Sequence, residues 1–512
     1  MVLKFYNTLT RRKDVFKPLR KDFVRIYSCG PTVYDYPHVG NLRAFVFCDL
    51  LRRYLKYRGF KVKHVMNITD VDDKTIRNSR KGGLTLKNFT KKYTEIFFSE
   101  MEKMNIEKFE VYPKATEHIQ DMVDLIKILL KKGFAYRGRD GSVYYRISKF
   151  GDYGKLSKLD ISSLKVGARV SQDEYTKDEA KDFALWKAWD PDDGNVYWET
   201  EIGRGRPGWH IECSAMSMKY LGHTFDIHTG GVDLIFPHHE NEIAQSEAAT
   251  GKPFVHYWLH NEHVMVEGKK MSKSLGNYLT LKDLMDRGHD PLAVRYALLS
   301  THYRSKLNIT DKTLWAAKQS VEKIYNFIDL LKEIEGGKEN KKVDKLIKNV
   351  QKDFREAMDD DLDIGTALAK FFDFIKEVNK LIDKKQIGRG NAQKCLDVVK
   401  KFDRVLGVLG TQIEASPELL AKLFALMIDM HETLKKRDKS LVSELEHLIR
   451  GMKGKEVDPE QFEKMVDVIA KIREELREKR MFDVSDKIRS DLKEMGILLE
   501  DKERGVRWRL IR

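Results

Sequence analysis

The chain has 512 residues, several times the roughly 150 residues of an average domain, so we expect about three or four domains. Its 41% hydrophobic and 34% charged residues exclude collagen-like, low-complexity and wholly disordered classes. The formal net charge of +15 favours a polyanionic partner such as nucleic acid, although an ordinary solvated basic surface would produce the same excess.

The compartment can be predicted from the cysteines and from the apolar runs. Four cysteines are too few for a disulfide scaffold and fit a reducing cytoplasm. The N-terminal residues contain no apolar signal segment, and no uncharged apolar run of about 18 residues occurs. We therefore expect a cytoplasmic protein that does not cross a membrane.

The first part of the chain alternates strand and helix patterns. Residues 24–29 predict a short strand, residues 42–57 an amphipathic helix closed by Gly59, and residues 61–66 a second strand. Strand, helix and strand at this spacing form a βαβ unit, which requires a parallel sheet.

An insertion interrupts this pattern over residues 113–200. It contains a predicted helix at 115–132, a predicted strand at 142–147 and a charged stretch at 173–182. The sheet pattern returns near 205–235, so we interpret the insertion as a separate subdomain.

The part of the chain after Pro291 is predicted to be almost entirely helical. Nine of the eleven prolines lie at or before Pro291, and proline breaks helix interiors. Apolar residues recur every three to four positions over 314–331, and similar stripes run through 344–384, 418–450 and 459–479. These stripes predict a helical bundle.

The first motif with a chemical meaning follows the first predicted strand. It ends in His38-Val39-Gly40-Asn41 and opens directly into the helix. A histidine, a small backbone and an amide at a helix N-terminus can hold phosphate oxygens, although a simple helix cap needs the same residue types. The position favours a ligand, because α/β proteins bind ligands at the carboxyl ends of their strands.

The second motif is Lys270-Met-Ser-Lys273-Ser, followed by Gly276. Two lysines beside small hydroxyl residues indicate a loop that brings cations to a developing pyrophosphate charge. A solvated basic turn is the alternative. No Gly-x-x-x-x-Gly-Lys-Ser/Thr loop is present, so a Walker-type nucleotide site is not supported.

The third motif lies where histidines are concentrated. Eight of the 15 histidines fall between residues 210 and 263. His238 and Glu242 are four residues apart and would point from one face of a helix expected at about 238–249. With Cys29 and Cys213 they would make a zinc site of two cysteines, one histidine and one glutamate. His239 is the rival ligand. In the alternative without a metal, the cysteine is a buried thiol, and His238 and Glu242 only cap the helix.

Taken together, these strings closely resemble the cysteinyl-tRNA synthetases, a family of class I aminoacyl-tRNA synthetases. The resemblance covers most of residues 20–310. It implies an α/β Rossmann-like catalytic domain with a parallel sheet, split by an insertion and followed by an all-α bundle and a small C-terminal anticodon-binding domain. The matching strings are 29–35, 67–73, 207–216, 226–228, 236–245 and 270–277. The implied domains are the catalytic domain at 1–112 and 201–255, the connective insertion at 113–200, the stem-contact region with the lysine loop at 256–310, the helical bundle at 311–410 and the anticodon-binding region at 411–512.

The resemblance also implies an activity and its cofactors. ATP, with Mg²⁺, would activate L-cysteine to cysteinyl-adenylate, and the cysteinyl group would then be transferred to the terminal ribose of tRNA-Cys. The resemblance also implies that the protein is a monomer. One zinc ion per chain would select the substrate thiolate, since a hydroxyl is a poor competitor for zinc.

The same resemblance assigns roles to single residues. His38, Gly40 and Asn41 would hold ATP, and Lys270 and Lys273 would bind it and stabilise the transition state. The implied zinc ligands are Cys29, Cys213, His238 and Glu242. Thr69, Trp209, His210 and His228 would shape and line the cysteine pocket, with a packed core as the alternative for each.

Near the C-terminus, residues 477–501 resemble the anticodon-reading segment of the family. Phe482 stands where the family usually has tryptophan and can still stack on a base. Arg477, Asp486 and Arg489 are candidates for reading base edges and backbone, and an amphipathic helix with charge pairs is their alternative. The region at 410–460 is longer than the family usually needs, and we assign it no function.

Two other functions compete with this interpretation. A paralogous ATP-dependent cysteine ligase acting on a small-molecule amine would lack the C-terminal module. A non-catalytic tRNA-binding protein would lose the signature residues. The sequence retains the module and both signatures, which argues against both alternatives.

Overall fold

The computed structural model describes residues 2–158, 169–170, 181–271, 276–409, 417–452, 459–501 and 506–510. Lys273 and most of the charged stretch predicted at 173–182 lie outside these residues. The chain forms two compact units, Met1–Leu409 and Gly410–Arg512, which we describe separately. Within the described ranges, no helix is both long enough and apolar enough to cross a bilayer.

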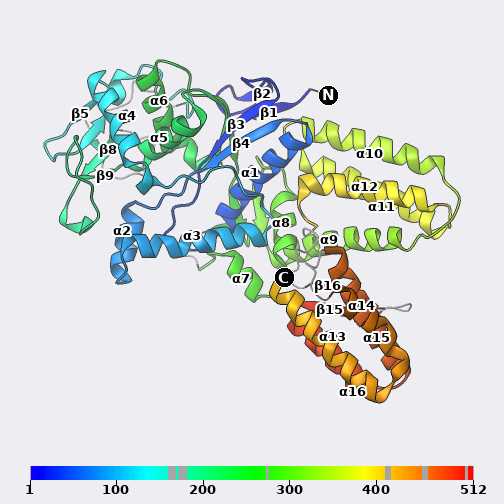
Figure 1. Cartoon of the computed structure of the whole chain (residues 1–512). Helices are drawn as coiled ribbons and strands as arrows, with labels where there is room; N and C mark the ends of the chain where they lie inside the picture. The colour runs from blue at the N-terminus through cyan, green and yellow to red at the C-terminus, as the bar shows by residue number, and fades with distance from the viewer. Residues whose placement is uncertain are drawn as a thin grey trace. The chain divides into compact units, whose positions relative to one another are not determined.

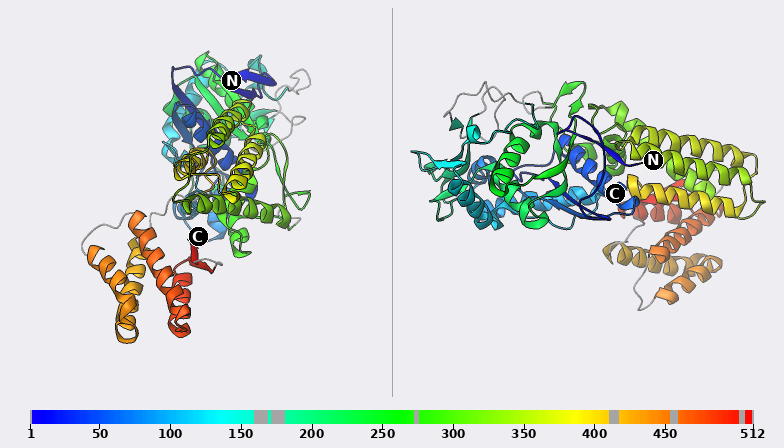
Figure 2. Two further views of the ribbon diagram at one scale, coloured as in Figure 1. Left: turned by 90° about the vertical axis from the view of Figure 1, so that its right-hand side faces the viewer. Right: turned by 90° about the horizontal axis from the view of Figure 1, so that it is seen from above.

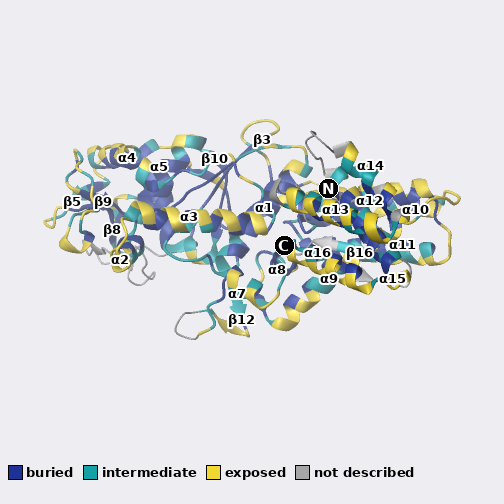
Figure 3. Cartoon of the chain, turned by 60° about the horizontal axis from the view of Figure 1, so that its bottom comes forward, coloured by how far each residue is buried: buried dark blue, intermediate teal, exposed yellow. Residues whose placement is uncertain are grey.

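A four-stranded parallel sheet lies at the centre of the first unit. Its strand order is β11-β10-β3-β4, and each neighbouring pair is parallel. Almost every residue of β3 is buried, as expected for a strand covered on both faces, and the strands around β10 are dark blue in Figure 3. The strands are β3 (Phe23–Ser28), β4 (Lys61–Met66), β10 (Phe225–Gly231) and β11 (Val255–Asn261).

Helix α1 (Val39–Tyr57) connects β3 to β4. The two strands and the helix confirm the predicted βαβ unit. Further helices of this region, and an N-terminal hairpin, surround the sheet (Figure 1). They are β1 (Lys4–Asn7), β2 (Arg12–Val15), α2 (Asp73–Lys81), α3 (Leu86–Lys103), α5 (Trp209–Leu221) and α6 (Glu240–Thr250).

The insertion contains the predicted helix and strand. The helix is α4 (Ile119–Lys131), and the strand is β6 (Val143–Tyr145), which pairs antiparallel with β5 (Ala135–Arg137) and β8 (Asp182–Ala188). Two short strands complete this sheet, β7 (Arg169–Val170) and β9 (Gly205–Pro207). Because β9 pairs antiparallel with β8, the prediction that the central sheet returns near residue 205 was wrong, and the central sheet returns at β10.

The remaining part of the first unit confirms the predicted helical bundle. Leu314, Ala317, Val321, Ile324 and Leu331 are all buried along one face of α9. Helices α10, α11 and α12 lie side by side in Figures 1 and 2. The elements are β12 (Val264–Val266), β13 (Lys269–Lys270), α7 (Leu281–Asp286), α8 (Pro291–Leu299), β14 (Leu307–Ile309), α9 (Asp311–Lys332), α10 (Lys341–Asp359), α11 (Ile364–Asp383) and α12 (Arg389–Leu406).

A buried charge network joins α1 to α8 and α12. The Asp49 carboxylate accepts from Arg53 Nε at 2.7 Å and from Arg295 Nη2 at 2.5 Å. Arg295 Nε also donates to the Leu406 carbonyl at 2.8 Å. Burial alone would raise the pKa of Asp49, but the two guanidinium groups hold it below its ordinary value.

The second unit has its own apolar core, which includes Leu423, Met427, Leu445, Phe462 and Ile469. The apolar stripes at 418–450 and 459–479 correctly predicted helices here. The C-terminal hairpin had not been predicted. The elements are α13 (Pro417–Arg437), α14 (Val442–Met452), α15 (Pro459–Glu478), α16 (Phe482–Glu494), β15 (Ile497–Asp501) and β16 (Val506–Leu510).

Candidate functional site

The structure brings Cys29, Cys213, His238 and Glu242 together. Cys29 directly follows β3, Cys213 lies in α5, and Glu242 lies in the first turn of α6. Their ligand atoms all lie within 4.8 Å of one another. Cys29 is partly buried and the other three are fully buried. The four donors therefore form one compact cluster at the edge of the sheet where β3 ends.

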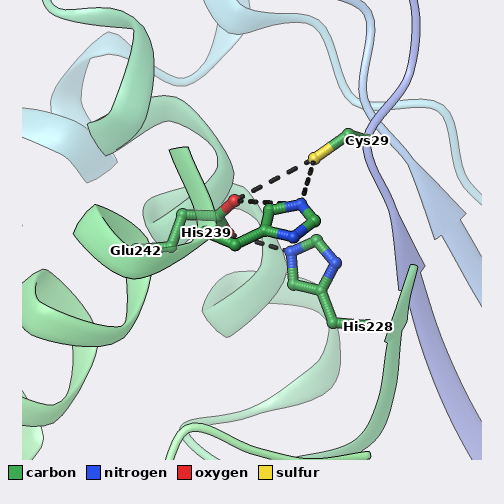
Figure 4. Close-up of side chains that lie close together, drawn as sticks. All are labelled: Cys29, His228, His239 and Glu242. Atoms are coloured by element: carbon green, nitrogen blue, oxygen red, sulfur yellow. Dashed lines mark hydrogen bonds and ion pairs between the residues drawn. The ribbon is translucent and has the colours of Figure 1, made fainter. Parts of the chain in front are cut away.

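A second group shares two of these residues. It consists of Cys29, His228, His239 and Glu242, and its ligand atoms also lie within 4.8 Å of one another (Figure 4). Cys29 Sγ is 3.3 Å from His239 Nε2 and 3.9 Å from Glu242 Oε1. Glu242 Oε2 is 3.0 Å from His228 Nε2. His239 is therefore a geometrically valid rival to His238, as the sequence had indicated.

The hydrogen bonds distinguish the two histidines. Both ring nitrogens of His239 are engaged, Nδ1 with His260 Nε2 at 2.8 Å and Nε2 with the Cys29 sulfur. His238 Nδ1 lies 2.9 Å from His210 Nδ1, but His238 Nε2 is buried and forms no hydrogen bond of regular geometry. This nitrogen is 3.1 Å from Glu242 Oε1. A buried nitrogen that lies beside a carboxylate and lacks a hydrogen bond of regular geometry fits a metal ligand.

The charges of the first group also suit a cation. Burial raises the pKa of Cys213, but the hydrogen bond from Cys29 and the positive His238 outweigh it and lower the pKa to about 6. Burial likewise opposes ionisation of Glu242, yet His228 and His238 lower its pKa to about 2. A thiolate and a carboxylate beside a thiol and a histidine form a donor set that zinc accepts once the histidine has released its proton.

Burial lowers the pKa of His238, but Cys213 and Glu242 raise it to about 10. In contrast, burial and the neighbouring His228 and His260 hold the pKa of His239 well below its ordinary value. The acidic groups of the first cluster thus attract positive charge to the position of His238, where a bound cation would replace the proton.

Three of the four predicted pocket residues contact this cluster. The Trp209 ring centroid is 4.2 Å from that of His238. His210 contacts His238 and His228 contacts Glu242 through the nitrogens described above. The fourth, Thr69, is one step away, because its Oγ1 donates to Glu212 Oε2 at 2.9 Å and Glu212 precedes Cys213.

A hydrogen-bond chain that the sequence analysis missed connects the two cysteine-bearing segments. The Gly30 amide donates to Asn67 Oδ1 at 2.9 Å, and Asn67 Nδ2 donates to Thr69 Oγ1 at 3.0 Å. Thr69 then donates to Glu212. A signal was present, since Asn67 follows β4 as Cys29 follows β3, and neighbouring parallel strands end at the same edge of a sheet.

The first sequence motif, which ends in His38-Val39-Gly40-Asn41, forms a reciprocal helix cap. His38 Nδ1 accepts from the Asn41 amide at 3.1 Å, and Asn41 Oδ1 accepts from the His38 amide at 3.2 Å. The cap that was considered as an alternative is therefore present. It holds both side chains at the N-terminus of α1, where the helix dipole favours phosphate.

Met271 of the second motif lies beside the first motif. A Cβ added to Gly40 would be 3.6 Å from the Met271 methyl carbon and 2.9 Å from the His38 ring. The Val39 amide donates to the Leu279 carbonyl at 2.9 Å. Lys270 is exposed in β13, whereas Lys273 lies outside the described residues. Met271 thus lies at the same end of α1 as the first motif.

The four anticodon candidates are all exposed side chains of the second unit. Arg477 lies in the last turn of α15. Phe482 begins α16 and is 53% exposed, which is high for a large apolar side chain. Asp486 and Arg489 lie farther along α16.

A parallel sheet whose first helix starts at the His38–Asn41 motif, with Met271 of the lysine motif beside it, is the architecture of a class I aminoacyl-tRNA synthetase. Residues 15–319 match the family of tRNA synthetases class I (C) catalytic domain, and residues 353–410 match the DALR domain. The fold resembles Mycobacterium tuberculosis methionyl-tRNA synthetase in complex with methionyl-adenylate, with a TM-score of 0.55 and 13% identity over 75% of this chain and 90% of that one. These findings confirm the predicted fold class.

Curated relatives specify the family. The cysteine–tRNA ligase of Protochlamydia amoebophila is 48% identical over 83% of this chain and 90% of the relative. The enzyme of the same name from Brachyspira hyodysenteriae is 49% identical over 79% and 85%. The chain therefore belongs to the cysteine–tRNA ligase family and is a ligase, which confirms the resemblance and does not favour either competing function.

Proposed function

We propose that this ligase activates L-cysteine with ATP and transfers the cysteinyl group to the terminal ribose of tRNA-Cys. A carboxylate oxygen of cysteine attacks the α-phosphorus of ATP, and pyrophosphate leaves. A ribose hydroxyl then attacks the carbonyl carbon of the adenylate, and AMP leaves. Convergence of Cys29, Cys213, His238 and Glu242 from separate elements carries this proposal, because it supplies a binding site for a thiol.

In this proposal, Cys29, Cys213, His238 and Glu242 hold one zinc ion. Bound zinc lowers the pKa of a thiol and prefers sulfur to a hydroxyl oxygen, so it would distinguish cysteine from serine. An apolar pocket alone would reject an isosteric hydroxyl by only about 10²-fold. The rings of Trp209, His210 and His228 shape the surrounding pocket.

ATP would bind at the His38–Asn41 motif and the Lys270–Ser274 motif. His38, Gly40 and Asn41 would contact ATP at the N-terminus of α1, with Mg²⁺ accompanying the phosphates. A Cβ at residue 40 would lie 2.9 Å from the His38 ring and 3.6 Å from the Met271 methyl carbon, and this crowding against His38 supports a role for Gly40. Lys270 and Lys273 would stabilise the charge on the departing pyrophosphate.

We assign the parts of the chain to tRNA recognition as follows. The catalytic domain spans 1–112 and 201–255, the connective insertion 113–200, the stem-contact region 256–310, the helical bundle 311–410 and the anticodon-binding region 411–512. The exposure of Phe482, Arg477, Asp486 and Arg489 supports their proposed contact with the anticodon. The DALR match within the bundle also fits a tRNA ligase.

The test is cysteine-dependent ATP–pyrophosphate exchange, run in parallel with serine and after removal of metal by chelation. We expect exchange with cysteine only, and loss of exchange after chelation that added zinc restores. Equal exchange with serine would contradict selection by the thiol. Full exchange in metal-free protein would remove zinc from the mechanism.

The zinc ligands are tested separately by metal content. We expect His238→Asn to lose most of about one zinc per chain and His239→Asn to retain it. The two histidines are adjacent and buried, so each variant controls for the structural effect of the other. Retention in His238→Asn with loss in His239→Asn would assign the site to the group of Cys29, His228, His239 and Glu242.

A further inference from the structure

The C-terminal end of α1 meets α10 and α12 in the first unit (Figure 1). Two adjoining hollows are lined by residues of these three helices. Their volumes are about 490 and 610 Å³, and Tyr57 and Lys401 line both. Nine basic and only three acidic residues line the pair. The two hollows therefore form one continuous, strongly positive surface.

Part of this positive charge is already neutralised. Arg58 pairs with the buried Asp359, and Lys56 pairs with Glu107 at 2.8 Å. Arg53 pairs with Asp49 in the buried network, and Arg355 Nε lies 3.8 Å from Asp359 Oδ2. These cations serve the fold.

Five other cations remain, and we call the surface that they line the basic groove. All five are exposed, and within the described part of the chain none forms an ion pair. Unpaired like charges held close together repel one another, and this repulsion destabilises the folded protein. A polyanion bound in the groove would reduce the repulsion. The five are Lys348 and Lys352 of α10 and Lys400, Lys401 and Arg404 of α12.

The cations form two short rows. Lys348 and Lys352 are four residues apart, which places them on one face of α10, and Lys400 and Arg404 are related in the same way on α12. Tyr57 lies between the rows, half-buried, with Lys401 Nζ 5.6 Å from its ring centroid. Each row follows its helix for about 6 Å at a rise of about 1.5 Å per residue.

This composition fits a phosphodiester backbone better than other anions. Small-molecule sites are enclosed and mainly apolar, whereas lysines on open helix faces dominate here. A protein partner would need exposed aromatic or aliphatic anchors, and the lining offers only the half-buried Tyr57. Lysine acts as a point charge toward phosphate oxygens, which are the commonest protein contacts on nucleic acids.

We propose that the basic groove binds the phosphate backbone of the tRNA body, away from the acceptor end. This inference rests on the proposed function. The nucleotide motif and the groove lie at opposite ends of α1, whose 19 residues span about 28 Å. The groove is thus a contact distinct from the site that receives the tRNA 3′ end.

The test uses full-length protein carrying Lys348→Gln, Lys352→Gln and Lys401→Gln together. The matched control carries Lys323→Gln, Lys370→Gln and Lys376→Gln, which remove the same charge from exposed positions of α9 and α11. Affinity for tRNA-Cys is measured over a range of salt concentrations, and cysteine-dependent pyrophosphate exchange is measured without RNA.

We expect the groove variant to bind tRNA about tenfold more weakly, with the slope of log affinity against log salt reduced by about 2. The control should lose much less, and exchange should be unchanged in both. Equal weakening in the two variants would overturn the proposal, because it would reflect overall charge alone. Unchanged binding of tRNA-Cys by the groove variant would also overturn the proposal. This holds even if the variant bound another RNA or an acidic protein more weakly than the unaltered protein does. Absence of exchange in the unaltered protein would instead refute the proposed function.

Discussion

Gly30 couples the metal cluster to the hydrogen-bond chain behind it, so Gly30→Ala is a sharp test of the site. A Cβ on this residue would lie 1.7 Å from the Asn67 carbonyl oxygen and 2.9 Å from the carbonyl carbon. The φ angle of Gly30 is not left-handed, so glycine is required here by space and not by backbone conformation. Ordinary contact begins at about 3.4 Å, so one of the two backbones must move by more than an ångström.

The loss in free energy of unfolding that Gly30→Ala causes depends on which atoms must move. Overpacking a core costs about 1–3 kcal/mol, and the clash with backbone places this substitution at the upper end, about 3 kcal/mol. The Gly30 amide also donates to Asn67, so the same movement displaces Cys29 from the cluster. Misplacing a reacting group by about 1 Å can cost about 10²-fold in rate.

The assays are urea denaturation, zinc content and pyrophosphate exchange. The control is Gly336→Ala, because a Cβ at Gly336 meets no atom within 4 Å and its φ is not left-handed either. We expect the control to behave like the unaltered protein. A Gly30→Ala protein with unchanged stability, zinc and exchange would refute the close approach of the two segments.

Three further predictions concern other parts of the chain. Burial raises the pKa of Glu100 from 4.5 to about 7, so the folded state favours the protonated carboxyl. The folded protein therefore loses at most about 3 kcal/mol of stability as the pH rises from 4.5 through 7. Glu100→Gln should abolish most of this loss, which urea denaturation curves of both proteins at pH 5 and pH 8 would measure. Asp49→Asn should destabilise the protein by about 3–5 kcal/mol, because it removes the ion-pair partner of the buried Arg295 and leaves Arg53 with only Glu107, 3.8 Å away. A thermal shift smaller than that of an exposed Asp→Asn change would contradict this. Phe482→Ala should weaken tRNA-Cys binding by about 1–3 kcal/mol without changing exchange, and equal loss of exchange would show that its effect is structural.

The sequence alone determined the family and those elements that have a clear hydrophobic period. The βαβ unit and the bundle helices were predicted correctly, because hydrophobic periodicity is a local property that β3, α1, β4 and α9 express within their own residues. The spacing of His238 and Glu242 was informative for the same reason. Long strings such as residues 207–216 carried the resemblance that the relatives confirmed.

Only the tertiary structure decided which side chains meet. Cys29 and Cys213 reach one cluster because α5, which carries Cys213, packs against β3, which Cys29 follows, and no local pattern records that packing. The distinction between His238 and His239 depends on which ring nitrogen finds a hydrogen-bond partner. The basic groove likewise exists because α10 and α12 pack beside the end of α1, whereas in the sequence its lysines are ordinary members of two amphipathic helices.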